Sequence, residues 1–306
     1  MDLHADAFGF VHRAKAVFVD DSELRGAVAD NVLDRVWRGT YRATDAAPSD
    51  RDEQYRERVF AASLGGGDER VLSHSSAAAV HRLPLLEPDH QLVHFVTTSG
   101  GRETPTVFLH RDRRLQPSDI EIIDGRRVTT LGRTAADVAR MGSFDQAVCA
   151  LDAALALGVG RDVLDQHAAR ARRQHGAATL RRALAVADGR AESVAESYSR
   201  AVILTFPDIP EPEIQHVIHD ECGRFVARVD FLIAGCVVGE MDGRAKYRSA
   251  TYGRDVEEVL YEEKVREDAL RALGYVVVRW SWADLRHPER LHAKILRALE
   301  LAARLA

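Results

Sequence analysis

The alternation of apolar and polar positions is clearest in the carboxy-terminal third of the chain. Within Phe225–Tyr247, two runs rich in β-branched residues flank Ala234-Gly235, which predicts a β-hairpin. Tyr275–Trp282 is a nearly continuous apolar run, as expected for a buried central strand. The charged segment Asp255–Leu273, which a glycine follows, predicts a long helix between the hairpin and this strand.

Further elements flank this core. A helix runs through the segment that begins at Ser193, and a strand is predicted over Glu213–Asp220. An amphipathic helix over His287–Arg304, capped by Asp284, completes the pattern. Because helical and strand-like periods follow one another here, we treat residues 191–306 as one domain of α/β character.

The first part of the chain predicts a smaller unit. A short helical pattern begins at His12, and Ser22 caps a second helix that Asn31 can end in a left-handed conformation. Leu33–Arg42 then alternates with period two, and a glycine marks a bend in it. Helix, turn, helix and β-ribbon is the order of a winged helix, so we predict a winged-helix domain over residues 1–44.

A polar segment, Asp45–Glu53, leads into a middle αβ domain predicted for residues 54–190. An alanine-rich helix with a serine cap stops before Pro84, and a later strand turns into a helix at which Thr134 is the expected cap. The other expected elements are strands at 90–97, 106–110 and 120–124 and helices at 144–157, 161–173 and 177–187. The fold class is therefore α/β, in the form of an α+β multidomain chain.

The net charge, the lengths of the apolar runs and the number of cysteines exclude some classes of protein. The net charge of −5 argues against a protein permanently coated with nucleic acid but leaves room for a local basic face. No apolar run has transmembrane length, and no segment resembles a signal peptide, so we expect no membrane partner. The three cysteines are odd in number and form no C-x-x-C pair, which indicates a reducing cytoplasm.

The predicted winged helix supplies candidates for DNA binding. The second helix of such a unit enters a major groove, while arginines of the wing contact phosphate. Arg25 is the candidate on the helix, and the candidates on the ribbon are Arg35, Arg38 and Arg42. The alternative is a small packing domain with solvated arginines, because residues 1–60 carry nine Lys/Arg and twelve Asp/Glu.

The predicted hairpin carries a group of carboxylates. Side chains alternate faces along a strand, so Glu240 and Asp242 point to the same side, roughly 7 Å apart. Asp230 joins them only if the hairpin loop has an odd number of residues. A divalent cation such as Mg²⁺ or Mn²⁺ would offset the repulsion between these carboxylates. In the alternative interpretation they are a turn residue, a strand-end cap and a solvated side chain.

The same stretch resembles a known nuclease family. The segments D-F-L, G-E-x-D-G, K-Y and G-Y-V-V-V-R-W resemble the very-short-patch-repair (Vsr)-like branch of the PD-(D/E)XK nuclease superfamily. The resemblance covers roughly residues 193–306 and implies an α-β-β-β-α-β fold in which Asp230 and Glu240 hold Mg²⁺. The lysine position of the family motif is occupied by Asp242, and Lys246 is a displaced substitute.

The nuclease resemblance implies a role for Glu196, and three basic residues of the same domain are further candidates. Glu196, on the helix before the sheet, completes the acidic site, with a salt-bridge ladder to Arg200 as the alternative. Lys264 and Arg266, on the long charged helix, are candidates for phosphate contact. Arg279 interrupts an apolar strand and needs a partner. That partner is either a carboxylate of the acidic cluster or the scissile phosphate, with Glu263 or Glu267 as the structural alternative.

Other segments resemble a family of regulators. R-V-x-R-G-x-Y, L-S-H-x-S-A-A and T-x-x-x-R-T-A-A-D-V-A-R are similar to segments of AbiEi-type antitoxin and regulator proteins, which begin with a winged helix. This resemblance implies transcriptional regulation and a cognate toxin as partner. Within the last of these segments, Arg133 and Asp137 are spaced for an ion pair on one helix face. His94 lies in a strand-like segment without nearby cysteine and is interpreted as a surface histidine.

The sequence therefore predicts a DNA-binding protein whose last domain is a Mg²⁺-dependent endonuclease acting on double-stranded DNA. In that mechanism the bound metal lowers the pKa of a water molecule, and Lys246 orients that water or neutralises the phosphate. One alternative is an AbiEi-type regulator or antitoxin in which the nuclease-like domain is inactive. Another is a protein-interaction module that does not bind DNA.

Overall fold

The computed structural model describes residues 5–13, 21–65, 69–99, 103–242 and 256–305. The chain divides into two compact units, 1–138 and 139–306, which are described separately. Both contain helices and sheets, so the predicted mixed α/β class is confirmed. The finer division into domains at 1–44, 54–190 and 191–306 stays a prediction. Among the described helices, none is long and apolar enough to cross a membrane.

The first unit opens with a helix and a small antiparallel sheet of order β1-β3-β2. Leu24 and Leu33 form the buried centre of this part. Asn31 ends the helix at a φ of 59°, as predicted, and Gly39 turns the β2–β3 ribbon at a φ of 74°. The elements are β1 (Val11–His12), α1 (Asp21–Ala29), β2 (Leu33–Trp37) and β3 (Thr40–Ala43).

The helical pattern predicted from His12 is wrong at its start. His12 lies in strand β1 and pairs with Thr40 of β3. Its ring nitrogen also lies 2.7 Å from a carboxylate oxygen of Asp6. The strand pairing is a contact between distant segments, which overrides the weak local preference of a short helical pattern. The rest of that predicted helix lies outside the described residues.

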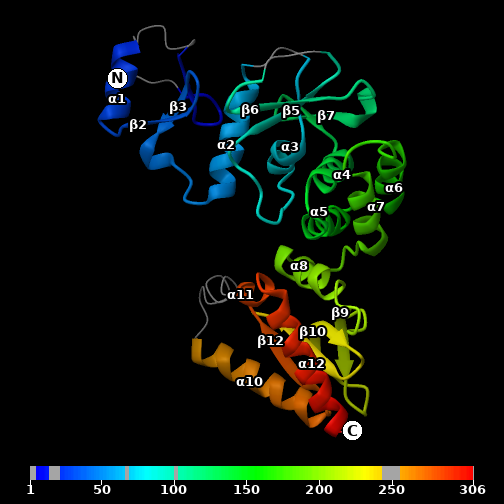
Figure 1. The fold of residues 1–306 in the computed structure, drawn as a ribbon. Coiled ribbons are helices and arrows are strands. Elements are labelled where there is room, and N and C mark those ends of the chain that lie inside the picture. Colours follow the sequence, from blue (N-terminus) through cyan, green and yellow to red (C-terminus); the bar gives the residue numbers. More distant parts are fainter. Residues whose placement is uncertain (1–4, 14–20, 66–68, 100–102, 243–255, 306) are drawn as a thin grey trace. The chain divides into compact units, whose positions relative to one another are not determined.

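A five-stranded mixed sheet of order β6-β5-β4-β8-β7 forms the second half of the first unit. Tyr55, Val59 and Phe60 of α2 and Val80 of α3 pack into its core, and Figure 1 shows the two helices beside the sheet. The elements are the 3₁₀ turn η2 (Thr44–Ala46), α2 (Arg51–Ser63), β4 (Val71–Leu72), α3 (His74–His81), β5 (Val93–Thr97), β6 (Val107–Arg111), the turn η3 (Pro117–Asp119), β7 (Ile120–Ile123) and β8 (Arg126–Thr129). The three strands predicted here are confirmed.

Helix α4 (Leu131–Met141) follows β8 and carries the predicted ion pair. The Arg133 side chain lies 2.7 Å from Asp137 and also 2.7 Å from Asp112, so the predicted pair is part of a larger buried group. The expected role of Thr134 as helix cap is wrong. Thr134 lies inside the helix, and its hydroxyl donates to the carbonyl of Thr129 at 3.0 Å.

The second unit begins with four helices: α5 (Phe144–Ala156), α6 (Arg161–Arg170), α7 (Ala177–Val186) and α8 (Val194–Ile203). Their positions agree with the helical patterns of the sequence. A buried ion pair joins the first of them to the last. Arg200 of α8 donates to both carboxylate oxygens of Asp152 on α5 at 2.8 Å, and Asp152 is fully buried.

The second unit ends in a four-stranded sheet of order β12-β11-β10-β9. Strand β10 is antiparallel to both of its neighbours, β9 and β11, and β12 runs parallel to β11. Helix α12 covers one face through Leu291 and Ile295, and α10 covers the other through Leu270 (Figure 1). The elements are β9 (Glu213–His219), β10 (Phe225–Ile233), β11 (Val237–Met241), α10 (Val256–Ala272), β12 (Val276–Trp280), α11 (Trp282–Leu285) and α12 (Pro288–Leu305).

Local details of this sheet follow from single residues. Gly239 of β11 packs closely against the Trp280 ring. A Cβ added at this position would stand 2.3 Å from the ring atom Cη2, so only glycine fits. Trp280 is buried and donates from Nε1 to the hydroxyl of Ser199 on α8 at 2.8 Å. The expected role of Asp284 as cap of the final helix is wrong. Asp284 lies in α11 and accepts from the backbone N–H of Ser281 instead.

Candidate functional site

The hairpin between β10 and β11 brings two of the predicted carboxylates opposite each other. Ile233 pairs with Val237, so the loop between them has three residues, with Gly235 at a φ of 68°. The odd number meets the condition set by strand alternation. Phe231 pairs with Gly239. Continuing that register by one residue places Asp230 opposite Glu240, and side chains directly opposite each other share a face of the sheet.

Two guanidinium groups bind Glu240. Arg266 of α10 donates from Nη2 to Oε1 at 2.6 Å, and Arg279 of β12 donates from Nε to Oε2 at 2.9 Å. Glu240 is only 8% exposed, so these bonds lie in a place with little water. Both oxygens of the predicted metal ligand therefore already have a positively charged partner.

Arg279 also binds the long helix. Its Nη1 donates to Glu267 at 2.5 Å, and its Nη2 lies 3.2 Å from Glu263. Burial lowers the pKa of Arg279, but its bonds to Glu267 and Glu240 raise it more, so the pKa lies above its ordinary value. The prediction that this arginine needs a carboxylate partner is confirmed for the acidic cluster and for both residues of the structural alternative.

The remaining acidic candidates are placed differently. The side chain of Asp230 accepts a hydrogen bond at Oδ2 from the backbone N–H of Met241 on the facing strand at 3.1 Å. Asp242 is exposed, and its N–H donates to the carbonyl of Trp280 at 2.8 Å. Lys246 lies outside the described residues.

Glu196 holds the start of α8. Its carboxylate accepts from the backbone N–H of Glu192 at 2.9 Å, from the hydroxyl of Ser193 at 2.8 Å and from the amide of Gln215 at 2.9 Å. Ser193, the N-cap residue, in turn accepts from the N–H of Glu196 at 3.2 Å, so the two side chains together hold the start of the helix. The alternative of a ladder with Arg200 is wrong, because Arg200 binds the buried carboxylate of α5. The S-x-x-E spacing is the sequence signal for this role.

The predicted donors do not fit a divalent cation in this arrangement. Mg²⁺ and Mn²⁺ need carboxylate oxygens whose charge is available to them. The two guanidinium groups already offset the charge of Glu240, and the buried carboxylate of Glu196 accepts three hydrogen bonds at the start of α8. In the parts of the chain that the structure describes, no three His, Cys, Asp or Glu side chains form a group that could hold a metal. We therefore assign no chemical step to a metal.

The helix and ribbon of the first unit carry exposed arginines. Arg25 lies on α1, Arg35 lies on β2, and Arg38 lies at the turn between β2 and β3. All three are exposed, and within residues 5–13, 21–65, 69–99 and 103–138 none has an ion-pair partner. Their guanidinium groups are open to an anion from solution. Lys264, on α10 of the second unit, is exposed too.

Arg42 does not belong to this set. Its side chain is 12% exposed and forms an ion pair with Glu57 of α2, and it lies 3.6 Å from Asp34. A guanidinium bound to two carboxylates is unsuited to bind phosphate, because the phosphate would have to displace both. We therefore remove Arg42 from the candidate interface.

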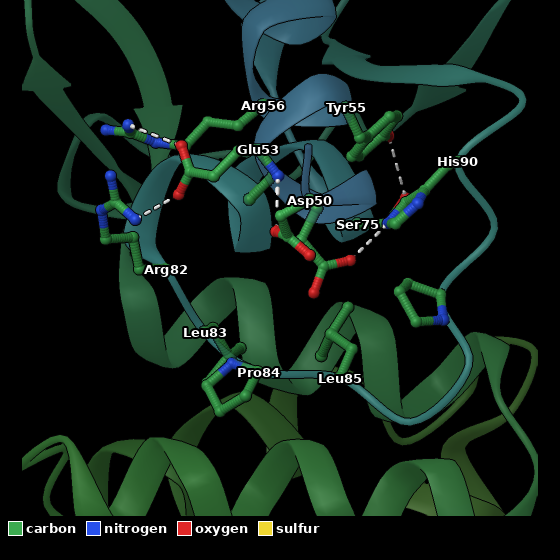
Figure 2. A pocket seen from close by; sticks show the side chains of 13 residues that line it. Asp50, Glu53, Tyr55, Arg56, Ser75, Arg82, Leu83, Pro84, Leu85 and His90 are labelled. Atoms are coloured by element: carbon green, nitrogen blue, oxygen red, sulfur yellow. Dashed lines mark hydrogen bonds and ion pairs between the residues drawn. The ribbon is translucent and has the colours of Figure 1, made fainter. Parts of the chain in front are cut away.

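A pocket of about 230 Å³ lies at the start of α2 in the first unit (Figure 2). The ring of Tyr55 stacks on His90 with centroids 4.5 Å apart, and His90 lies 3.2 Å from Asp52. Glu53 binds both Arg56 and Arg82, as the dashed lines in the figure mark. Because these charged side chains are partners of one another, we assign the pocket no ligand.

Three histidine rings contact one another beside the five-stranded sheet, and the sequence did not predict this cluster. His94 is 6% exposed, so its interpretation as a surface histidine is wrong. Its Nδ1 lies 3.0 Å from Nε2 of His110, and the ring of His74 stacks on His110 with centroids 3.6 Å apart. Burial lowers the pKa of His94. The signal available beforehand was weak, because the three residues come from a helix and two strands.

Comparison with known proteins places the chain in a family. Two proteins of Mycobacterium tuberculosis, "Uncharacterized protein Rv2248" of strain H37Rv and "Uncharacterized protein MT2308" of strain CDC 1551, are each 31% identical to it over 282 residues. The aligned part covers 92% of this chain and 97% of each relative. The chain belongs to their family. No family model matches the sequence.

Proposed function

We propose that the protein is a DNA-binding regulator that contacts double-stranded DNA through α1 and the β2–β3 ribbon. The observation that carries the proposal is the group of exposed arginines Arg25, Arg35 and Arg38 on these two elements, which form no ion pair with any residue that the structure describes in this unit. Phosphate contacts by arginine supply most of the affinity of a protein for duplex DNA. The cognate toxin implied by the AbiEi resemblance and the cytoplasmic location stay predictions.

The arrangement of the arginines suits a duplex. A helix followed directly by a β-ribbon is the order in which winged-helix proteins present a groove-binding element and a wing. Arg38 stands at the tip of the ribbon, where the chain reverses through Gly39. An exposed arginine at such a tip can approach the DNA backbone without disturbing the core, which is centred on Leu24 and Leu33.

The second unit, in this proposal, has a nuclease-like fold that does not catalyse. The order α8-β9-β10-β11-α10-β12 is the one that the nuclease resemblance implies. The charge of Glu240 is offset by two arginines rather than available to a metal. This unit would serve packing or partner binding. An endonuclease stays the competing prediction, since Asp230 lies opposite Glu240 in the extended register and the displaced Lys246 is not among the described residues.

Binding of a fluorescent duplex by the full chain, measured by anisotropy at several salt concentrations, tests the DNA proposal. We expect Arg38→Ala, Arg35→Ala and Arg25→Ala each to weaken binding and to reduce the salt slope by about 1. The exposed Arg113, which follows β6, provides a control with the same loss of charge, and Arg113→Ala should leave both quantities unchanged. Equal effects of Arg113→Ala and Arg38→Ala would argue for a diffuse charge effect and against a defined interface.

A second experiment separates the regulator from the endonuclease. Supercoiled and linear plasmids are incubated with the chain in Mg²⁺ and in Mn²⁺, and the wild type is compared with Asp230→Ala. The regulator proposal expects DNA binding without cleavage. Cleavage by the wild type that Asp230→Ala abolishes would overturn it and establish the endonuclease. A mismatched duplex belongs in the assay, because an enzyme specific for a lesion would ignore ordinary plasmid.

A further inference from the structure

The charged network around Glu240 lies between the sheet and helix α10. Glu240 is on β11, Arg279 is on β12, and Arg266, Glu263 and Glu267 are on α10. The two arginine side chains are 38% and 35% exposed, and the Glu240 side chain is 10% exposed. The carboxylate therefore lies innermost and the guanidinium groups separate it from solvent.

A carboxylate in this position needs positive charge close to it. Loss of hydration disfavours its charged form, and an opposite charge within hydrogen-bonding distance offsets that cost. Two guanidinium groups bring two positive charges to Glu240, which is the charge of one divalent cation. Each of them donates to a different oxygen, at 2.6 and 2.9 Å, so each oxygen has its own positively charged partner.

The arginines are held in place by more than Glu240. Arg279 has a second and a third carboxylate partner in Glu267 and Glu263, which lie one turn apart on α10. Glu267 in turn binds Arg271, four residues later on the same helix. Displacing Arg279 from Glu240 would therefore break or distort the contact of α10 with β12 as well.

We propose that Arg266 and Arg279 take the place of a divalent cation at Glu240 and thereby lock α10 onto the sheet. The proposal does not rest on DNA binding by the first unit. It assigns Glu240 a positioning role, since its carboxylate joins β11 to α10 and β12 through the two arginines. The position of α10 on the sheet is then set by the ion pairs of Arg266 and Arg279 as well as by the packing of Leu270.

Binding of Mn²⁺ by the full chain, measured from the electron paramagnetic resonance signal of the free ion, tests the proposal. We expect the wild type to bind no Mn²⁺ at a site that depends on Glu240. The double variant Arg266→Met/Arg279→Met should gain a Mn²⁺ site. We expect that site to bind the ion at least about tenfold more tightly than any residual binding by the wild type, because the two guanidinium groups no longer repel it. Adding Glu240→Gln should remove that site.

Arg271→Met is the matched control, since it removes an arginine of α10 that binds Glu267 but not Glu240. It should leave Mn²⁺ binding as in the wild type. Mn²⁺ binding by the wild type that Glu240→Gln abolishes would overturn the proposal. A folded double variant without a new Mn²⁺ site would overturn it too.

A double-mutant cycle keeps the proposal testable if the double variant does not fold. The midpoint of urea unfolding is measured for the wild type, Glu240→Gln, Arg279→Met and the combination of the two. We expect Arg279→Met to lower the midpoint less in the Glu240→Gln background than in the wild type, because the contact with Glu240 is already weakened there while those with Glu263 and Glu267 remain. Shifts of the unfolding midpoint that simply add in the double variant would contradict the proposal that Glu240 and Arg279 hold α10 on the sheet together.

Discussion

Glu240 and Arg279 are direct partners in the register of the parallel strands β11 and β12, and a bond of 2.9 Å joins Arg279 Nε to Glu240 Oε2. The two residues are 39 positions apart in the sequence, with the whole of α10 between them. Strand pairing therefore aligns the carboxylate with its counter-charge, and Arg266 of the intervening helix adds the second one. The sequence shows Glu240 as part of an acidic group, and in the fold two guanidinium groups offset its negative charge.

Arg42 separates a structural arginine from the arginines that we propose to contact DNA. We expect Arg42→Met to lower the free energy of unfolding by about 1–2 kcal/mol, because Glu57 loses a charged partner in a half-buried place. DNA affinity at a temperature where the variant is folded should stay unchanged. Urea denaturation and anisotropy measure the two quantities. Arg35→Met should show the reverse pattern, and a loss of affinity in Arg42→Met without a loss of stability would contradict the assignment.

Gly239 should not tolerate a side chain. A Cβ at this position would stand 2.3 Å from Cη2 of the buried Trp280, and relief requires movement of the ring or the strand. We expect Gly239→Ala to destabilise the protein by about 1–3 kcal/mol. Gly26→Ala is the control, since nothing lies within 4 Å of the added Cβ and alanine favours a helix. Thermal unfolding followed by circular dichroism should show a lower midpoint only for the first variant.

The buried pair of Asp152 and Arg200 should matter more when broken than when removed. Asp152→Ala leaves a buried guanidinium without its carboxylate, and we expect a loss of about 3–5 kcal/mol in the free energy of unfolding. The double variant Asp152→Leu/Arg200→Met replaces both charges by apolar groups and should be more stable than either single variant. Urea denaturation of the four proteins tests this, and strictly additive losses would contradict it.

Stability should fall in mild acid because of His94. Burial lowers its pKa in the folded state, so below the ordinary value of about 6.5 the unfolded chain binds more protons than the folded one. The contribution of His94 to the free energy of unfolding is therefore fully present above about pH 6.5 and decreases as the pH falls from there towards the lowered pKa of the folded state. We expect His94→Asn, which cannot take up a proton, to show a smaller loss over that window. His175→Asn changes an exposed histidine, and an equal reduction there would refute the assignment to His94.

Local features were predictable where one segment carried enough information. The left-handed end of α1 at Asn31 and the bend at Gly39 depend on the backbone preferences of single residues. The odd loop that places Asp230 opposite Glu240 follows from a short glycine-containing turn. Glu196 follows Ser193 with the S-x-x-E spacing that is typical of a helix start, and its carboxylate binds the start of α8.

The sequence by itself determined most of the helices and strands after residue 70, the faces of the β10–β11 hairpin and the need of Arg279 for a partner, because periodicity and turn chemistry act over a few residues. Only the tertiary structure decided which partner each charge receives. It joined Arg42 to Glu57, Arg200 to Asp152 and Arg266 to Glu240. Such pairs connect elements that are distant in sequence, and the packing of helices on sheets, which no local pattern encodes, brings them within hydrogen-bonding distance.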